Sequence, residues 1–246
     1  MAAPLSWQLA TIAAIRDETP RVKTFVLDLP EWPGHLPGQH VDVRLTAEDG
    51  YEAQRSYSIA SAPIDEPRLE LTVEQVDDGE VSSFLHELAQ VGDRLEVRGP
   101  IGGYFVWDRR SNDPLLLVAG GSGIVPLMAM LRQRADVGGR APASLLYSSR
   151  TRDDVIYYDE LDRLAARDDG LRVLHTLTRA APPDWPGHRR RIDRELLSDA
   201  LADRAASAEA FICGPTALVE AAARELVELG MPAARVRTER FGPSGS

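Results

Sequence analysis

Apolar and polar residues alternate through the first hundred positions of the chain, from Trp7 to about Val106. A period of two is typical of strands that have one buried face. Five strands are predicted, with turns rich in Gly, Pro and Asp between them: 21–29, 39–45, 54–59, 68–76 and 93–98. A short helix over 82–89 interrupts the alternation. Short strands at this spacing predict a small antiparallel barrel.

The pattern changes after Pro114. Strands and helices now alternate, and the first strand is a continuous apolar run, which is typical of a strand buried on both faces. Strands are predicted over 115–118, 143–147, 171–177, 208–213 and 234–239, and helices over 125–134, 158–166, 193–201 and 216–229. This order predicts a parallel sheet built from βαβ units. We therefore expect a β-barrel domain over 1–108 and an α/β domain over 109–246, with a surface loop over 179–191.

Composition narrows the possible partners. The 246 residues carry a formal net charge of -10, which argues against nucleic acid or an anionic membrane as the main partner. Cys213 is the only cysteine, so the chain cannot form an internal disulfide or hold an iron–sulfur cluster by itself. The five histidines show no metal-ligand spacing, and no metal site is expected. There is no apolar run of membrane-spanning length and no signal-like start, so we expect a cytoplasmic protein.

A glycine-rich turn follows the first strand of the α/β half. Gly120, Gly121 and Gly123 allow close backbone approach to a ligand, and Pro126 suits the first turn of a helix. Free N–H groups at a helix start favour a phosphate. The sequence therefore predicts that this turn, with Ser122, binds the phosphates of a nucleotide. A tight strand–helix turn without a ligand is the alternative.

The end of the next strand carries Ser149, Arg150 and Arg152. In nucleotide-binding folds an acidic residue here accepts from a ribose 2′-hydroxyl, whereas arginine accommodates a 2′-phosphate. The residues therefore favour NADPH over NADH. In the alternative, the two arginines form surface ion pairs with neighbouring carboxylates: Asp153, Asp154 or Glu160.

Three motifs occur in a fixed order: Arg55-Ser56-Tyr57-Ser58, Gly120 to Pro126, and Cys213-Gly214-Pro215. In this order and spacing the chain resembles the ferredoxin–NADP reductase family of flavoproteins, over about residues 7–243. The resemblance implies a six-stranded antiparallel barrel that binds FAD, followed by a five-stranded parallel α/β domain that binds NAD(P)H. It points to a stand-alone form without an iron–sulfur domain. FMN in place of FAD is the alternative flavin.

The resemblance also assigns residues to the flavin. Arg55 would bind a flavin phosphate, Tyr57 would lie against the isoalloxazine ring, and Ser58 would hydrogen-bond the N5 edge. A glycine and hydroxyl residues at the start of the short helix would bind phosphate, or they would simply cap the helix. The remaining flavin contacts implied are Ser56, Val73, Glu74, Gln75, Gly79, Val81, Ser82, Ser83 and Phe241.

On the nicotinamide side, the resemblance places Cys213 near the hydride path as a positioning residue. Glu239 would organise the hydride site or relay protons, so that Ser58, Cys213 and Glu239 form the predicted catalytic set. Phe241 would stack on the flavin, although the chain continues past it as 242–246. The NADPH contacts implied are Gly120, Gly121, Ser122, Gly123, Ser149, Arg150, Arg152, Tyr157, Cys213, Gly214 and Pro215.

The activity implied is hydride transfer from NADPH to flavin N5, followed by single-electron transfer to a separate acceptor. Ferredoxin, flavodoxin, a haem protein and an oxygenase component are the acceptors considered. Arg109, Arg110 and the run 189–191 are candidates for a basic docking face, with a solvated surface as the alternative. Two other functions stay open: an NAD(P)H-dependent flavin or quinone reductase with a small-molecule acceptor, and a non-catalytic electron-transfer subunit.

Overall fold

The computed structural model describes residues 5–63 and 67–241. The chain divides into two compact units. The first, which we call the barrel unit, comprises Met1–Asp108 together with Met128–Gln133. The second, the α/β unit, comprises Arg109–Leu127 and Arg134–Ser246.

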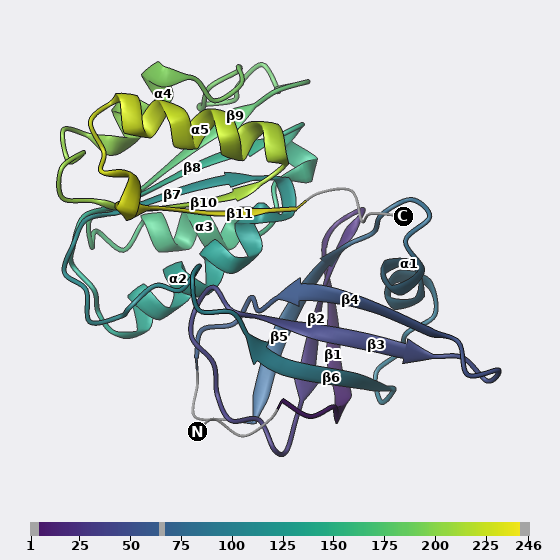
Figure 1. Cartoon of the computed structure of the whole chain (residues 1–246). Helices are drawn as coiled ribbons and strands as arrows, with labels where there is room; N and C mark the ends of the chain where they lie inside the picture. Colours follow the sequence, from purple (N-terminus) through teal and green to yellow (C-terminus); the bar gives the residue numbers. More distant parts are fainter. Residues whose placement is uncertain (1–4, 64–66, 242–246) are drawn as a thin grey trace. The chain divides into compact units, whose positions relative to one another are not determined.

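The described residues of the barrel unit form a six-stranded sheet in the order β4-β3-β6-β1-β2-β5, with every pair antiparallel (Figure 1). A bridge between Ile59, just after β4, and Leu71 of β5 joins the two ends of that order and closes the barrel. The strands are β1 (Gln8–Thr19), β2 (Val22–Asp28), β3 (His40–Thr46), β4 (Glu52–Ser58), β5 (Arg68–Glu74) and β6 (Arg94–Ile101).

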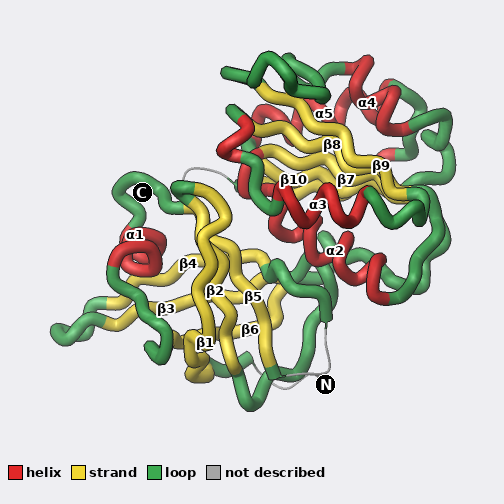
Figure 2. Tube along the Cα trace, turned by 180° about the vertical axis from the view of Figure 1, so that it is seen from behind, coloured by secondary structure: helices red, strands yellow, loops and turns green. Residues whose placement is uncertain are grey.

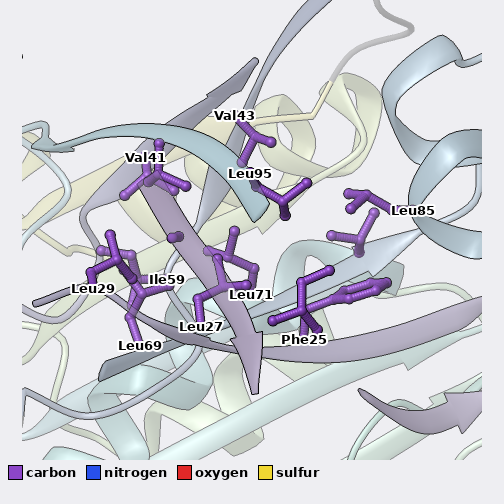
Figure 3. Close-up of a cluster of buried hydrophobic side chains, with 14 of the residues drawn as sticks. Phe25, Leu27, Leu29, Val41, Val43, Ile59, Leu69, Leu71, Leu85 and Leu95 are labelled. Atoms are coloured by element: carbon purple, nitrogen blue, oxygen red, sulfur yellow. The ribbon is translucent and has the colours of Figure 1, made fainter. Parts of the chain in front are cut away.

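Alternating side chains of these strands fill the barrel. The large ones that are almost fully buried include Phe25, Leu27, Ile59, Leu69 and Leu71, and Figure 3 shows them converging from different strands. Burial of one such side chain contributes about 1.5–3 kcal/mol. Helix α1 (Glu80–Glu87) contacts β3, β4 and β5 and adds Val81 and Leu85 to the same cluster. The core therefore fixes α1 beside β4.

The described residues of the α/β unit form a five-stranded sheet in the order β11-β10-β7-β8-β9, with every pair parallel. Helices α4 and α5 cover one face of this sheet, and α3 lies on the other (Figure 2). The strands are β7 (Leu115–Gly120), β8 (Ala143–Ser149), β9 (Leu171–Leu177), β10 (Glu209–Gly214) and β11 (Val236–Arg240). The helices are α3 (Tyr158–Ala165), α4 (Arg194–Leu201), α5 (Thr216–Glu228) and the two ends of α2 (Ile124–Asp136), whose middle residues, Met128–Gln133, are counted with the barrel unit.

Parallel strands bring their carboxyl ends to one edge of the sheet, and ligands of such folds bind there. β7 ends at Gly120, β8 at Ser149 and β10 at Gly214. These three strands are neighbours in the sheet. The topology therefore gathers the glycine turn, the arginine segment and the Cys-Gly-Pro motif at one edge.

The outer side of β9 is partly covered by the loop that follows it. His188 forms a parallel bridge with Thr176. The His188 N–H donates to the His175 carbonyl, and the Leu177 N–H donates to the His188 carbonyl, both at 2.9 Å. The predicted surface loop over 179–191 thus pairs partly with the sheet.

Two features that would bear on function are absent from the described residues. No helix among them has the length and apolar content needed to cross a membrane. No cluster of three or more His, Cys, Asp or Glu side chains in the same residues could hold a metal ion.

Candidate functional site

The glycine turn joins β7 to α2 through a 3-10 turn over Gly121–Gly123. Gly121 adopts φ +54°, and a Cβ added there would meet no heavy atom within 4 Å. A Cβ on Gly123 would lie 2.2 Å from the Cys213 carbonyl oxygen. Gly123 is therefore needed for packing against β10, whereas Gly121 leaves its backbone open. Helix α2 begins at Ile124, and the Ile124 N–H donates to the Gly121 carbonyl, so the turn and the helix form one continuous segment. This turn can bind phosphate oxygens.

The Cys-Gly-Pro motif packs directly on this turn. Gly214 adopts φ +149°, and a Cβ on it would lie 3.0 Å from both the nitrogen and the oxygen of Gly120. A Cβ on Gly120 would in turn lie 3.0 Å from Pro215 Cδ. Both motifs therefore depend on glycine for their close approach.

Tyr147 supports the same turn, and sequence reasoning missed it. Its hydroxyl donates to the Gly121 carbonyl at 3.1 Å and accepts from the Ile156 N–H at 3.3 Å. The Tyr147 ring is fully buried. Within the sequence it is an ordinary apolar strand residue, so only the fold reveals its contact with the turn.

Cys213 and Glu239 face each other in the register of β10 and β11. Cys213 is fully buried, and burial, aided by the charge of Glu239, raises the pKa of its thiol. The thiol therefore stays protonated and is not a nucleophile. Burial also raises the pKa of Glu239 to about 7. Its Oε2 is buried and has no hydrogen-bond partner within the described segments.

Phe241 follows at the end of β11. Its N–H donates to the Gly214 carbonyl at 3.0 Å, which ties the residue to the Cys-Gly-Pro motif. The proposed stacking of its ring on flavin stays a prediction, and residues 242–246 lie outside the described segments.

The end of β8 supports the predicted arginine site. Arg150 and Arg152 are exposed, and no carboxylate of the described residues pairs with either. Asp154 instead accepts from the hydroxyl of Thr151 at 2.7 Å. The Ser149 hydroxyl is buried and has no hydrogen-bond partner in that part of the chain. The surface ion pairs considered as the alternative are therefore not formed.

Two residues near this site were not predicted. The N–H of Arg179, which follows β9, donates to the Arg150 carbonyl at 2.9 Å, and this brings a third exposed arginine to the same edge. The Arg152 guanidinium lies 5.2 Å from the centre of the Tyr158 ring. By contrast, Tyr157 is only 3% exposed, because its ring is packed inside the protein at the start of α3. That burial leaves little ring surface for a ligand.

In the barrel unit, β4 presents the first predicted motif. The Arg55 guanidinium donates to the carbonyl of its neighbour Gln54 at 2.7 Å, and no described carboxylate pairs with it. Tyr57 is half-buried against the core, and burial raises the pKa of its hydroxyl, which stays neutral. Ser58 is 7% exposed, and its hydroxyl has no hydrogen-bond partner among the described residues.

Ser56 has a different environment. Its hydroxyl donates to Asp42, which is 6% exposed and also accepts from Arg98, both at 2.7 Å. The Arg98 guanidinium lies 4.7 Å from the Trp7 ring centre, and that of Arg44 lies 4.4 Å from it. Ser56 therefore holds β4 in place, and Asp42 is a support residue that the motif did not reveal.

The start of α1 forms a tight turn. A Cβ on Gly79 would lie 2.5 Å from Ser82 Oγ and 3.0 Å from the Val76 carbonyl oxygen, so the turn leaves little room for a side chain here. The Ser82 hydroxyl donates to the Gly79 carbonyl and accepts from the Val76 N–H, both at 3.2 Å. Ser83 has no such contact among the described residues, so its hydroxyl is the more available one. Val81 is fully buried, and only its backbone could reach a ligand.

The helix also begins earlier than predicted, at Glu80 rather than residue 82, because the turn at Gly79 and not a serine precedes its first residue. The Glu80 carboxylate accepts from the Tyr51 hydroxyl at 2.9 Å.

Two of the three predicted flavin contacts at the end of β5 use their backbone carbonyls in hydrogen bonds within the protein. The Val73 carbonyl lies 2.9 Å from His86 Nε2, and the Gln75 carbonyl accepts from Arg21 at 2.9 Å. Glu74 lies between them and pairs with Val22 in the sheet. Their flavin contacts stay predictions.

Comparison with known proteins identifies both halves. Residues 10–106 match the model of the oxidoreductase FAD-binding domain, and residues 117–224 match that of the oxidoreductase NAD-binding domain. The chain is 37% identical over 242 residues to "Ferredoxin--NADP reductase B" of Sorangium cellulosum, covering 94% of this chain and 96% of that protein. The chain belongs to the ferredoxin–NADP reductase family.

Other members of this family are longer. The chain is 34% identical to a glycine betaine monooxygenase reductase subunit of Chromohalobacter salexigens, but it spans only 61% of that protein's length. Among solved structures, it resembles the ferredoxin reductase of a carbazole 1,9a-dioxygenase with a TM-score of 0.82 and 27% identity, covering 98% of this chain and 70% of that one.

The donor set of this ferredoxin–NADP reductase family member fits its two cofactors. FAD carries a diphosphate, and the barrel unit offers the Arg55 guanidinium with no carboxylate partner among the described residues, as well as free N–H groups at the start of α1. NAD(P) also carries a diphosphate, and the turn at Gly121 leaves open space for it. The fold predicted from the resemblance, an FAD-binding barrel followed by a parallel α/β domain, is confirmed.

The predicted basic docking face is less available than its sequence indicates. Arg189 donates to the carbonyls of Pro182 and Pro183, at 3.0 and 2.8 Å. Arg190 pairs with Asp193 at 3.1 Å and with Glu195 at 2.9 Å. Arg191, Arg109 and Arg110 are exposed. The docking role of this set stays a prediction.

Proposed function

We propose that this protein oxidises NADPH and passes the electrons through FAD to a separate acceptor protein, a ferredoxin or an oxygenase component. The choice of NADPH rests on one observation. Arg150 and Arg152 stand exposed at the carboxyl end of β8, and no described carboxylate pairs with them. Two unpaired guanidinium groups at this edge favour a ligand that carries an additional phosphate.

FAD supplies the redox chemistry when bound, because it accepts a hydride and releases electrons one at a time. The protein's own residues bind and align the reactants. Arg55 would hold an FAD phosphate through its guanidinium, and the half-buried Tyr57 ring would provide a flat apolar surface. The free hydroxyl of Ser58 would donate a hydrogen bond to the flavin.

Cys213 and Glu239 would act beside the nicotinamide. The buried, protonated Cys213 is a small residue that fixes position without reacting. Glu239, whose pKa is raised by burial to about 7, can hold or release a proton near neutral pH. Together with Ser58 they form the proposed catalytic set.

The acceptor is proposed from the relatives. One is named as a ferredoxin–NADP reductase, and others are reductase components of oxygenase systems. A partner protein is required in this scheme, because the only thiol of the sequence, Cys213, cannot ligate a cluster by itself. We place the protein in the cytoplasm and the domain boundary between residues 108 and 109.

Anaerobic stopped-flow reduction of the purified, FAD-loaded protein tests the donor. NADPH should bleach the flavin absorbance at least about tenfold faster than NADH at equal subsaturating concentration, since one phosphate–arginine contact is worth about 1.5–3 kcal/mol. Arg150→Gln and Arg152→Gln should each slow the reduction of the flavin by NADPH and leave the rate of its reduction by NADH unchanged. Arg163→Gln, on an exposed position of α3, is the matched control.

A second assay tests the acceptor. Reduced protein is mixed with a ferredoxin, with free FMN and with a quinone, and the rate constants are compared. Preference for the ferredoxin supports the proposal. Equal or faster reduction of free FMN or quinone would instead identify a small-molecule reductase, and faster bleaching by NADH would exclude the 2′-phosphate site.

A further inference from the structure

The barrel closes where the residues after β4 meet β5, and we call this junction the seam. β4 and β5 stand at opposite ends of the strand order. The bridge between Ile59 and Leu71 joins them, and the Ala60 N–H donates to the Glu70 carbonyl at 2.8 Å. The seam therefore begins one residue after Ser58, whose hydroxyl is proposed to bond the flavin.

The seam is held by fewer backbone contacts than the strand pairs around it. β3 and β4 pair along their full lengths, seven residues each. β4 and β5 instead meet through an isolated bridge, to which the Glu70 N–H adds a hydrogen bond to the Ser61 hydroxyl at 3.1 Å. The end of β4 is therefore well fixed on its β3 side and less constrained on its β5 side.

The Arg132 side chain bonds both sides of the seam. Its Nη1 donates to the Ala60 carbonyl at 2.9 Å, on the β4 side, and to Glu70 Oε2 at 3.0 Å, on the β5 side. Arg132 lies in the middle stretch of α2 that is counted with the barrel unit, and its side chain is only 15% exposed. One largely buried cation therefore connects the two strands beside the flavin motif.

This contact is strong for physical reasons. Hydrogen bonds from a guanidinium are charge-assisted and roughly twice as strong as neutral ones. Ala60 is fully buried, and removal of Arg132 would leave its carbonyl without this donor, which is costly for a buried acceptor. The Glu70 carboxylate is also largely shielded from water. The contact can therefore fix the position of the peptide group that follows Ala60.

We propose that Arg132 is a positioning residue, which holds the seam closed and thereby fixes the Ser58 hydroxyl for hydride transfer to the flavin. Ser58 is the last residue of β4 and pairs with His40 of β3. The chain leaves Ser58 through Ile59 and Ala60, and Arg132 fixes the far end of this short connection. The inference rests on the role proposed for Ser58 in the preceding section. Hydride transfer needs near-contact geometry, so a displacement of about 1 Å can slow it by up to about 100-fold.

Arg16 provides a matched control. Its guanidinium pairs with the other oxygen of the same carboxylate, Glu70 Oε1, but it lies on β1 and its side chain is 48% exposed. Within the described segments it makes no hydrogen bond to Ala60. Loss of Arg16 therefore removes a charge from Glu70 without releasing the β4 side of the seam.

Anaerobic stopped-flow reduction of the full-length, FAD-loaded protein tests this role. The donor is NADPH or NADH, whichever reduces the wild-type flavin faster, and its concentration is varied to separate the limiting rate constant of reduction from the apparent Kd. Arg132→Gln should lower the limiting rate constant about tenfold or more. The apparent Kd should stay within about twofold, because the proposed nucleotide contacts are other residues. Arg16→Gln should change both quantities by less than about twofold.

A double variant shows whether Arg132 acts through Ser58. Ser58→Ala should itself slow the reduction of the flavin. In the Ser58→Ala protein, Arg132→Gln should then slow reduction by less than about twofold more, because the hydroxyl that Arg132 positions is already gone. If the two residues acted independently, their effects would multiply.

The single variants separate this inference from the proposed function. A wild-type rate in Ser58→Ala would refute the role proposed for Ser58, and this inference with it. A slow Ser58→Ala protein together with an unchanged limiting rate constant in Arg132→Gln would overturn the inference alone. Multiplicative effects in the double variant, or equal slowing in Arg16→Gln, would also overturn it.

Circular dichroism and FAD content establish that each variant is folded and loaded. If Arg132→Gln does not retain FAD, Glu70→Gln decides, because it keeps the shape of the side chain and removes the charge that holds Arg132. Glu70→Gln should slow the limiting step more than Arg16→Gln does. Equal rates in these two variants would overturn the proposal.

Discussion

Replacement of Glu239 by glutamine should stabilise the protein at high pH and leave it unchanged at low pH. Glu239 has a buried Oε2 without a partner among the described residues, and burial raises its pKa from the ordinary value of 4.5 to about 7. The unfolded chain releases this proton near pH 4.5, whereas the folded protein holds it up to about pH 7. Stability therefore falls as pH rises across this window, because the native state binds more protons than the unfolded state.

The magnitude follows from that shift. At about 1.36 kcal/mol per pKa unit, a rise from 4.5 to about 7 costs about 3 kcal/mol once the pH exceeds both values. Glutamine has the same shape but no charge to bury. Glu239→Gln should therefore gain up to about 3 kcal/mol at pH 8.5 and almost nothing at pH 4. For a chain of this size that gain raises the melting temperature by about 6–12 °C.

Thermal unfolding of the full-length protein, followed by far-ultraviolet circular dichroism, measures the gain in stability at pH 8.5 and at pH 4. The matched control is Glu228→Gln, which removes an exposed carboxylate of α5 and should show no comparable gain at high pH. An equal gain for Glu239→Gln at both pH values would refute the reasoning, since the effect would then come from packing and not from ionisation. A loss of stability at high pH would refute it as well.

Three further substitutions test the site, and two of them have a control substitution. Gly123→Ala places a Cβ 2.2 Å from a backbone oxygen and should lower the free energy of unfolding, measured by chemical denaturation, by about 3 kcal/mol or more. Its control, Gly121→Ala, places the Cβ in open space and should cost only about 1–2 kcal/mol, because alanine is strained at a positive φ. Asp42→Asn should lower the free energy of unfolding by about 1–3 kcal/mol and weaken the retention of FAD on dialysis. Its control, Asp28→Asn, removes a carboxylate from a more exposed ion pair and should lower the free energy of unfolding by less than about 1 kcal/mol. Tyr147→Phe removes the hydroxyl that holds the glycine turn and should raise the KM for NADPH several-fold with little change in kcat, and an unchanged KM would contradict that support role.

Local patterns in the sequence identified most of the elements. The strands of the α/β unit are apolar runs flanked by turns, and their predicted positions agree with β7 to β11 within a few residues. Strand β1 was not assigned, because Leu9 is 48% exposed and the pairing with β2 shifts register between Ile12 and Ala14. A strand with such irregularities does not show a clean period of two.

The residues of the candidate site also fall into those that the sequence reveals and those that it does not. Glycines at turns and arginines at the end of a strand can be recognised from the sequence, because the residues next to them define the turn or the strand end. Tyr147, Asp42 and Arg179 act on residues that are distant in sequence or on a neighbouring strand, through hydrogen bonds that only the folded chain brings about. No short motif carries such a contact.

The pairing of His188 with the outer side of β9 has a consequence for how the protein behaves among its own copies. An uncovered sheet edge presents a row of unpaired N–H and C=O groups and acts as a template for another chain. The loop after β9 pairs with part of this edge through His188, and the opposite edge strand, β11, is only five residues long. Shortening this loop would expose the template and promote strand-to-strand association, even though every residue proposed to bind NADPH or FAD would still be present.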